Sequence, residues 1–94
     1  MKCNKIAFSG HIISQMFKRN ISVDDIIVIL EDGEIIAAYS DDKPYPSYLI
    51  LGFRNERPLH LVVAKDNQTD QCIMLTVYEP DQKAWSLDFK SKIK

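Results

Sequence analysis

The fold is decided where the chain reads LEDGEIIAAY, residues 30–39. Up to Gly33 the apolar residues recur at helical spacing, and after it they follow the pattern of an extended strand. Glycine commonly ends a helix by adopting a left-handed conformation, so we expect Gly33 to be such a stop. The change of period predicts a helical part followed by a sheet, which together make an α+β domain.

Two helices are predicted before this glycine, and both begin with a serine cap. Ser9 and Ser22 can each accept a hydrogen bond from the first turn of a helix. Asp25 stands where a capping box places an acidic side chain. The predicted helices cover residues 10–19 and 23–31, within a helical pair of residues 9–32.

Four strands are predicted after the helices, at residues 34–40, 47–54, 59–65 and 71–78. The connections are short and rich in turn-forming residues, so neighbouring strands should pair as antiparallel hairpins over residues 34–80. The tail, residues 81–94, is expected either to add a fifth edge strand or to be frayed. The sequence thus predicts one domain, residues 1–94, with two N-terminal helices packed on a four- or five-stranded antiparallel sheet.

Net charge, hydrophobic segments and cysteine spacing limit the classes of protein to which the chain can belong. The formal net charge of −1 argues against broad electrostatic capture of nucleic acid, which would favour a basic chain. No apolar run is long enough to cross a bilayer and no signal-peptide pattern follows Met1, so the expected location is the cytoplasm. Cys3 and Cys72 lie far apart in the sequence, and in that compartment two free thiols are expected. No metal-ligand spacing is present, and no cofactor is predicted.

Strand alternation separates the side chains of the predicted sheet into two faces. One face is apolar and is expected to pack against the helices; it holds Leu49, Leu51, Phe53, Leu59, Leu61, Val63, Ile73, Leu75 and Val77. The other face is mixed in character and would be open; it carries Arg54, His60, Thr76 and Tyr78. A shift of one residue in register would exchange the two faces of a strand.

Histidine and arginine are the residues here best suited to chemistry on phosphate esters. Histidine exchanges protons near neutral pH, and the arginine guanidinium binds phosphate through two parallel hydrogen bonds. His60 would lie on the open face, and Arg57 precedes its strand. His11 and Arg19 lie on the first predicted helix. Each has a structural alternative, such as a half-buried, hydrogen-bonded histidine at position 60 or a helix-end cation at position 19, and the alternatives stay open.

Four short motifs give the chain a resemblance to a known family. They are Ser9-Gly10-His11, Arg19 before Ile21-Ser22, Arg57-Pro58-Leu59-His60, and Thr76-Val77-Tyr78 before Pro80. Over about residues 8–80 the chain resembles a small DUF-4258-like bacterial family, whose members are similar to toxins of type II toxin–antitoxin pairs. The predicted order of elements is also similar to the RelE-like and barnase-like ribonuclease fold.

The resemblance implies a metal-independent RNA endonuclease with an antitoxin protein and RNA or the ribosome as partners. In such toxins the 2′-hydroxyl attacks the adjacent phosphate, a general acid and base assist, and cations stabilise the phosphorane. By the resemblance, His60 would be the general acid or base and His11 its partner, while Tyr78 would donate a hydrogen bond or stack on a base. The implied substrate-binding residues are Arg57, Arg19, Arg54 and Thr76.

A non-catalytic protein-interaction module is the alternative function. Exposed apolar residues on a sheet often mark an interface. The open face would offer Tyr48, Ile50, Val62, Met74 and Tyr78. A small-molecule or metal enzyme is the least supported class, because the chain has only three glycines and no phosphate-binding loop. No membrane partner is expected, and the sequence leaves the oligomeric state open.

Overall fold

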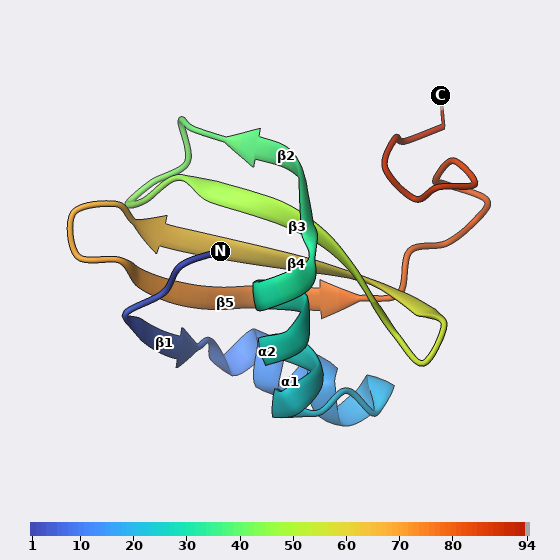
Figure 1. Ribbon diagram of the computed structural model, residues 1–94, viewed down its shortest axis with the longest axis horizontal. Helices are drawn as coiled ribbons and strands as arrows, with labels where there is room; N and C mark the ends of the chain where they lie inside the picture. Colours follow the sequence, from blue (N-terminus) through green and yellow to red (C-terminus); the bar gives the residue numbers. More distant parts are fainter. Residues whose placement is uncertain (94) are drawn as a thin grey trace.

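Two helices and five strands make up the structure, a computed structural model that describes residues 1–93. In chain order they are β1 (Lys5–Phe8), α1 (Gly10–Arg19), α2 (Val23–Asp32), β2 (Glu34–Tyr39), β3 (Ser47–Arg54), β4 (Arg57–Asp66) and β5 (Gln71–Tyr78). The strands form one sheet in the order β1-β5-β4-β3-β2, against which both helices pack (Figure 1). The predicted α+β architecture is confirmed, in a mixed sheet whose pairs are antiparallel except for β1 with β5. None of the helices described is both long and apolar enough to cross a membrane.

The fifth strand comes from the N-terminal end of the chain. β1 lies parallel to β5, with Phe8 opposite Met74. It has four residues and stops at the Ser9 cap, so its apolar pattern is too short to stand out in the sequence. The sheet is therefore mixed, where the sequence had predicted antiparallel pairing throughout.

The tail after β5 stays outside the sheet. Residues 81–93 form turns with one isolated bridge, between Trp85 and Lys92. The edge strand considered for this tail is therefore not formed within the described residues, and Lys94, its last residue, lies outside them. Figure 1 shows the tail on the side of the sheet away from the helices.

Both helices begin as their sequences predict. The Ser9 hydroxyl accepts a hydrogen bond from the Ile12 N–H at 3.1 Å. The Ser22 N–H donates to the Asp25 carboxylate at 2.9 Å, and the Asp25 N–H donates to the Ser22 hydroxyl at 3.1 Å, which completes a capping box. The Ser9 hydroxyl also donates to the Leu75 carbonyl at 3.0 Å, so the same cap attaches α1 to β5.

Gly33 ends α2, but not in the left-handed conformation expected from the sequence. Its φ is −73° and its ψ is 164°, which is extended backbone. A Cβ at this position would lie 2.5 Å from Cγ2 of Ile50 and would also meet the Ile29 carbonyl oxygen. Glycine is therefore required here by close packing of the α2–β2 connection on β3, and the left-handed stop was wrong.

The main core lies between the helices and one face of the sheet. Its fully buried members include Ile12, Ile26, Ile29, Ile50, Leu59, Leu61, Val63, Met74 and Val77. The prediction for β3 was reversed, because Ile50 lies opposite Leu61 and Leu51 lies opposite His60. Directly opposite residues share a face, so Ile50 joins the core and Leu51 faces away from the helices.

Two local features explain why strand alternation failed in part. Gly52 carries no side chain, and a Cβ there would lie 2.7 Å from Cγ1 of Ile29, so α2 packs directly on the backbone of β3. In β5 the register shifts between Val62 and Val63 of β4, which leaves Leu75 as an extra residue and brings Met74 onto the core face. Neither the close packing at Gly52 nor the extra residue Leu75 changes the apolar pattern of the sequence, so strand alternation could not reveal them.

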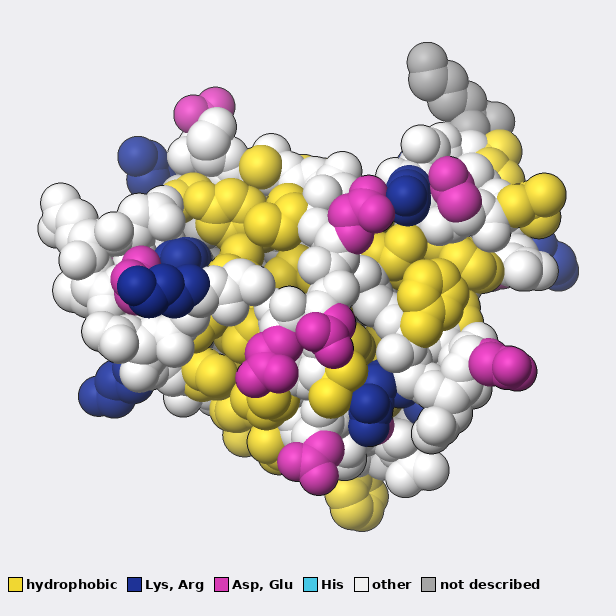
Figure 2. Space-filling view, in the orientation of Figure 1, with side chains coloured by type: hydrophobic (Ala, Val, Ile, Leu, Met, Phe, Trp, Pro, Cys, Tyr) yellow, Lys and Arg dark blue, Asp and Glu magenta, His cyan; other side chains and the backbone are white. Residues whose placement is uncertain are grey.

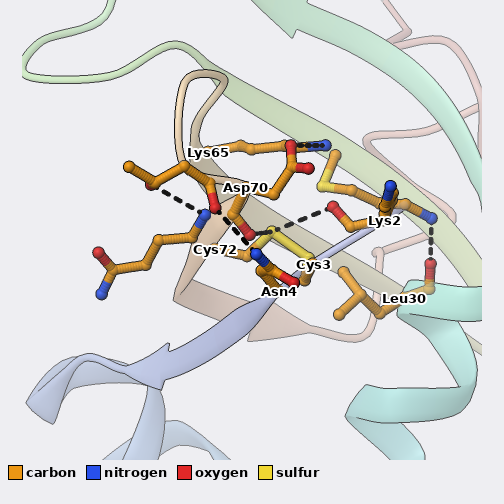
Figure 3. The surroundings of a disulfide bond; sticks show 10 residues. Lys2, Cys3, Asn4, Leu30, Lys65, Asp70 and Cys72 are labelled. Carbon is orange, nitrogen blue, oxygen red and sulfur yellow. Dashed lines mark hydrogen bonds and ion pairs between the residues drawn. A yellow bond between two sulfur atoms is a disulfide. The ribbon is translucent and has the colours of Figure 1, made fainter.

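A disulfide joins the N-terminal segment to β5. The sulfur atoms of Cys3 and Cys72 are 2.06 Å apart, so the two free thiols expected from the sequence were wrong (Figure 3). The parallel pairing of β1 with β5 brings these distant positions together, and strand β1 was not predicted. The terminal amino group of Met1 also donates to the Leu30 carbonyl at 2.6 Å, so the first residues contact both β5 and α2.

Candidate functional site

His60 lies in β4 on the sheet face away from the helices, and it is fully buried. Its Nε2 is 2.8 Å from the Phe89 carbonyl oxygen and its Nδ1 is 3.2 Å from the Tyr78 hydroxyl. A carbonyl oxygen only accepts, so Nε2 carries the proton and Nδ1 accepts from Tyr78. Burial lowers the pKa of His60 and outweighs the hydrogen bond to Phe89, which acts in the opposite direction. The ring is therefore neutral with both nitrogens occupied.

The tail covers His60 from the outer side. The rings of His60 and Trp85 meet edge-to-face with centroids 4.4 Å apart, and Tyr78 contacts the same imidazole at 5.2 Å. Phe89 in turn packs edge-to-face on Phe53 of β3 at 6.4 Å. Burial raises the pKa of the Tyr78 hydroxyl, with the charge of Tyr39 as a smaller contribution. In this arrangement neither His60 nitrogen can reach a substrate.

Arg54 lies on the helix face of the sheet, opposite to the side that the sequence suggested. Its Nε is 2.8 Å from the Asp25 carboxylate in the first turn of α2. The backbone hydrogen bond from Ser22, followed by the Arg54 side chain, lowers the pKa of Asp25. Arg54 thus reinforces the capping box of α2, and its guanidinium is committed to that carboxylate.

Arg57 binds the last carbonyl groups of α1. Its guanidinium donates to the Arg19 carbonyl at 2.8 Å and to the Asn20 carbonyl at 3.4 Å, and it lies 3.6 Å from the Glu79 carboxylate. A cation at this place satisfies free carbonyls and complements the helix dipole. The structure therefore assigns Arg57 a capping role, while the Arg19 side chain is exposed at the end of α1.

The residues predicted to form one site are divided between the two sides of the sheet. His60 and Tyr78 are opposite neighbours, and Thr76 shares their face because it pairs with Val62. His11 is exposed on α1, which packs on the other face through Ile12 and Met16. Arg54, Arg57 and Arg19 also gather near the helix ends. The two histidines therefore do not share a cleft.

A groove with a volume of about 620 Å³ lies between α2 and the tail. β2 begins at Glu34, opposite Leu51, so the last three residues of β3 pair with β4 on one side and have no strand on the other, and the groove lies there. The side chain of Phe53 is 55% exposed in it, and that of Leu87 is 88% exposed. We call this hollow, lined by the end of α2, residues 51–53 and residues 87–90, the α2–tail groove.

Charged side chains border the α2–tail groove. They are Asp32, Glu34, Asp88 and Lys90. The Lys90 ammonium is 3.1 Å from the Glu34 carboxylate, so the rim remains acidic overall. Figure 2 shows the apolar side chains as a patch on the right of the view, below a row in which one basic side chain stands between acidic ones. In the sequence this surface was indicated only by the alternation of Trp85, Leu87 and Phe89 with polar residues, which suggested the edge strand that was one of the two expectations for the tail.

The described residues contain no group of three or more His, Cys, Asp or Glu side chains placed to hold a metal ion. A family model for a domain of unknown function, DUF4258, matches residues 8–79. Comparison with curated proteins and with solved structures found no match. The matched range includes both helices and β2 to β5, and it ends before the tail that covers His60.

Proposed function

The chain belongs to the DUF4258 family, and we propose that it acts as a non-catalytic protein-interaction module whose binding surface is the α2–tail groove. The observation that carries the proposal is an apolar groove in which Phe53 and Leu87 are largely exposed. Large exposed apolar patches with a polar rim are typical of interaction sites. This surface differs from the open face considered at first, since Ile50 and Met74 of that face are buried in the core.

The groove favours one class of partner. Its floor is apolar and aromatic, and its rim has three carboxylates, Asp32, Glu34 and Asp88, against the single ammonium of Lys90. A segment with large apolar side chains next to lysine or arginine would bury its apolar part and face carboxylates with its cations. We therefore take the partner to be an apolar, basic protein segment.

Metal-independent RNA cleavage, as in toxins of toxin–antitoxin pairs, is the second candidate. It is favoured by one observation, the direct contact of His60 with Tyr78 on the face away from the helices. The contacts described above count against it, because His60 is buried and Arg54 and Arg57 are bound to protein groups. Cleavage would require the tail to leave His60 and a phosphate-binding cation to come from elsewhere.

The test is a titration followed by NMR, with two synthetic helical peptides of identical apolar content. One peptide carries lysines beside its leucine and phenylalanine residues, and the other carries glutamates. We expect the basic peptide alone to shift the signals of Phe53 and Leu87, and Leu87→Ser to weaken its binding. Val23→Ser is the matched control, since Val23 is 53% exposed but lies at the start of α2, outside the residues that line the groove. Equal binding of both peptides, or shifts confined to other surfaces, would contradict the proposal.

The second candidate is tested separately with RNA. The wild-type chain and His60→Ala are incubated with a structured RNA and with an unstructured RNA in the presence of a chelator. No cleavage by either protein is expected. Cleavage by the wild type that is lost in His60→Ala would overturn the non-catalytic assignment in favour of the endonuclease.

A further inference from the structure

Helix α1 exposes two large apolar side chains on its outer side. Ile13 is 57% exposed and Phe17 is 91% exposed. They are four residues apart, so they lie on the same side of the helix one turn from each other. Ile12 and Met16 already provide the contacts of α1 with the core. Ile13 and Phe17 therefore stay outside the buried core that α1 packs against, and we call this pair the α1 knob.

The charges around the α1 knob are opposite to those around the α2–tail groove. α1 contains no acidic residue, and its last turn carries Lys18 and Arg19, both exposed. At the rim of the groove, the carboxylates of Asp32 and Asp88 take part in none of the ion pairs of the described residues, although Asp88 accepts hydrogen bonds from the Ser86 hydroxyl and the Lys90 N–H. An apolar knob beside cations is thus complementary in shape and charge to an apolar groove beside anions.

The two surfaces cannot meet within one molecule. α1 packs against β5, whereas α2 packs against β3 and forms one wall of the groove. In the sheet order β1-β5-β4-β3-β2, β4 separates these two strands. A groove of about 620 Å³ is within the size range that holds a small-molecule ligand, so it has room for two side chains.

From these observations we propose that the partner of the α2–tail groove is a second copy of this chain, which inserts Ile13 and Phe17 of its α1. Lys18 and Arg19 of the inserted helix then face Asp32 and Asp88. This inference rests on the proposed function, because it names the occupant of the same groove. Knob and groove are different surfaces, so the contact is heterologous, and a pair of copies joined in this way still offers one free knob on one copy and one free groove on the other. The association therefore extends head-to-tail as the concentration rises.

The test is a mixing experiment with two variants at exposed positions. Phe17→Asp disables the knob and Leu87→Asp disables the groove, and both side chains are almost fully exposed, so the fold should remain intact. Sedimentation velocity should show wild-type particles that grow beyond a dimer with concentration, and association at least about tenfold weaker for each variant alone. An equimolar mixture of the two variants retains one good knob and one good groove, and it should stop at a dimer.

Charge reversal supplies the second arm of the test. Lys18→Glu with Arg19→Glu should weaken self-association and make it less sensitive to salt, whereas Lys43→Glu, at an exposed loop position, should not. A wild-type chain that stays monomeric while the basic peptide still binds the groove would overturn this inference and leave the proposed function standing. A wild-type chain that neither binds the basic peptide nor self-associates would contradict the proposed function as well. Variants that self-associate as well as the wild type would show that another surface is used.

Discussion

Acid should destabilise this protein through His60 at a higher pH than through its capping carboxylate. Burial lowers the pKa of His60 in the folded chain below the ordinary value of 6.5. As the pH falls below 6.5, the unfolded chain takes up a proton at this imidazole and the folded chain does not. Folding stability therefore decreases with falling pH, from 6.5 down to the folded pKa, and then levels off.

The size of this effect has an upper limit set by one proton. A single proton bound by the unfolded state alone changes the free energy of unfolding by about 1.4 kcal/mol per pH unit. A protonated His60 would have no carboxylate partner, since its neighbours are the Tyr78 hydroxyl, the Phe89 carbonyl and the Trp85 ring. At neutral pH, replacing it by glutamine should cost about 1–3 kcal/mol, because the part-buried hydrogen bonds of His60 with the Phe89 carbonyl and the Tyr78 hydroxyl are lost.

Urea unfolding between about pH 7 and about pH 5 measures the change of the unfolding free energy with pH and the cost of His60→Gln at neutral pH. This range brackets the ordinary histidine pKa. The wild type should lose stability across this range, while His60→Gln should start lower at neutral pH and lose less. His11→Gln is the matched control, because His11 is the only other histidine and is exposed on α1. It should keep the wild-type dependence on pH. If wild type and His60→Gln showed the same slope, or if NMR found that His60 titrates at its ordinary pKa, the reasoning about its burial would be refuted.

Three further predictions concern stability, and urea unfolding measures each of them. Replacing Cys3 and Cys72 together by serine should cost about 4 kcal/mol on the loop-closure model, since the disulfide spans 69 residues of sequence; equal stability with and without reductant would contradict the disulfide. Gly52→Ala should cost about 1–3 kcal/mol because its Cβ would lie 2.7 Å from Ile29, whereas no penalty would mean that α2 can move away. Asp25→Asn should cost about 1 kcal/mol at neutral pH through loss of the capping box. Because folding lowers the pKa of Asp25 below 3.8, that difference should shrink as the pH falls below 3.8, and a difference that persisted in acid would exclude the carboxylate as its cause.

The parts of the fold that sequence reasoning predicted correctly depend on near neighbours. The capping box of Ser22 and Asp25 involves residues three positions apart, and it formed as expected. The antiparallel order of β2 to β5 follows from short connections that leave neighbouring strands little choice of partner. At Gly33 the sequence predicted the end of the helix correctly but gave the wrong physical reason for the glycine. Close packing, and not a left-handed turn, requires glycine there.

The candidate site was predicted less well because each of its residues can have either a catalytic or a structural role, and the neighbouring sequence is the same in both cases. His60 was placed on the correct face with Tyr78, but the sequence did not indicate that the tail would bury it. Arg57 was considered for phosphate binding, yet the carbonyls that it caps belong to α1, far away in sequence. Arg54 was assigned to the wrong face because both faces of β3 are apolar, so alternation could not distinguish them.

The sequence by itself determined the two helices with their serine caps, the positions of β2 to β5 and their antiparallel pairing, because these depend on periodicity and on contacts between residues close in the chain. Only the tertiary structure decided that Cys3 meets Cys72, that Ile50 rather than Leu51 faces the helices, and that the tail closes over His60. These contacts join residues far apart in sequence, and each competes with an alternative that has the same local pattern. The packing of the whole chain selects among such alternatives, since it is the total buried surface, not the local pattern, that differs between them.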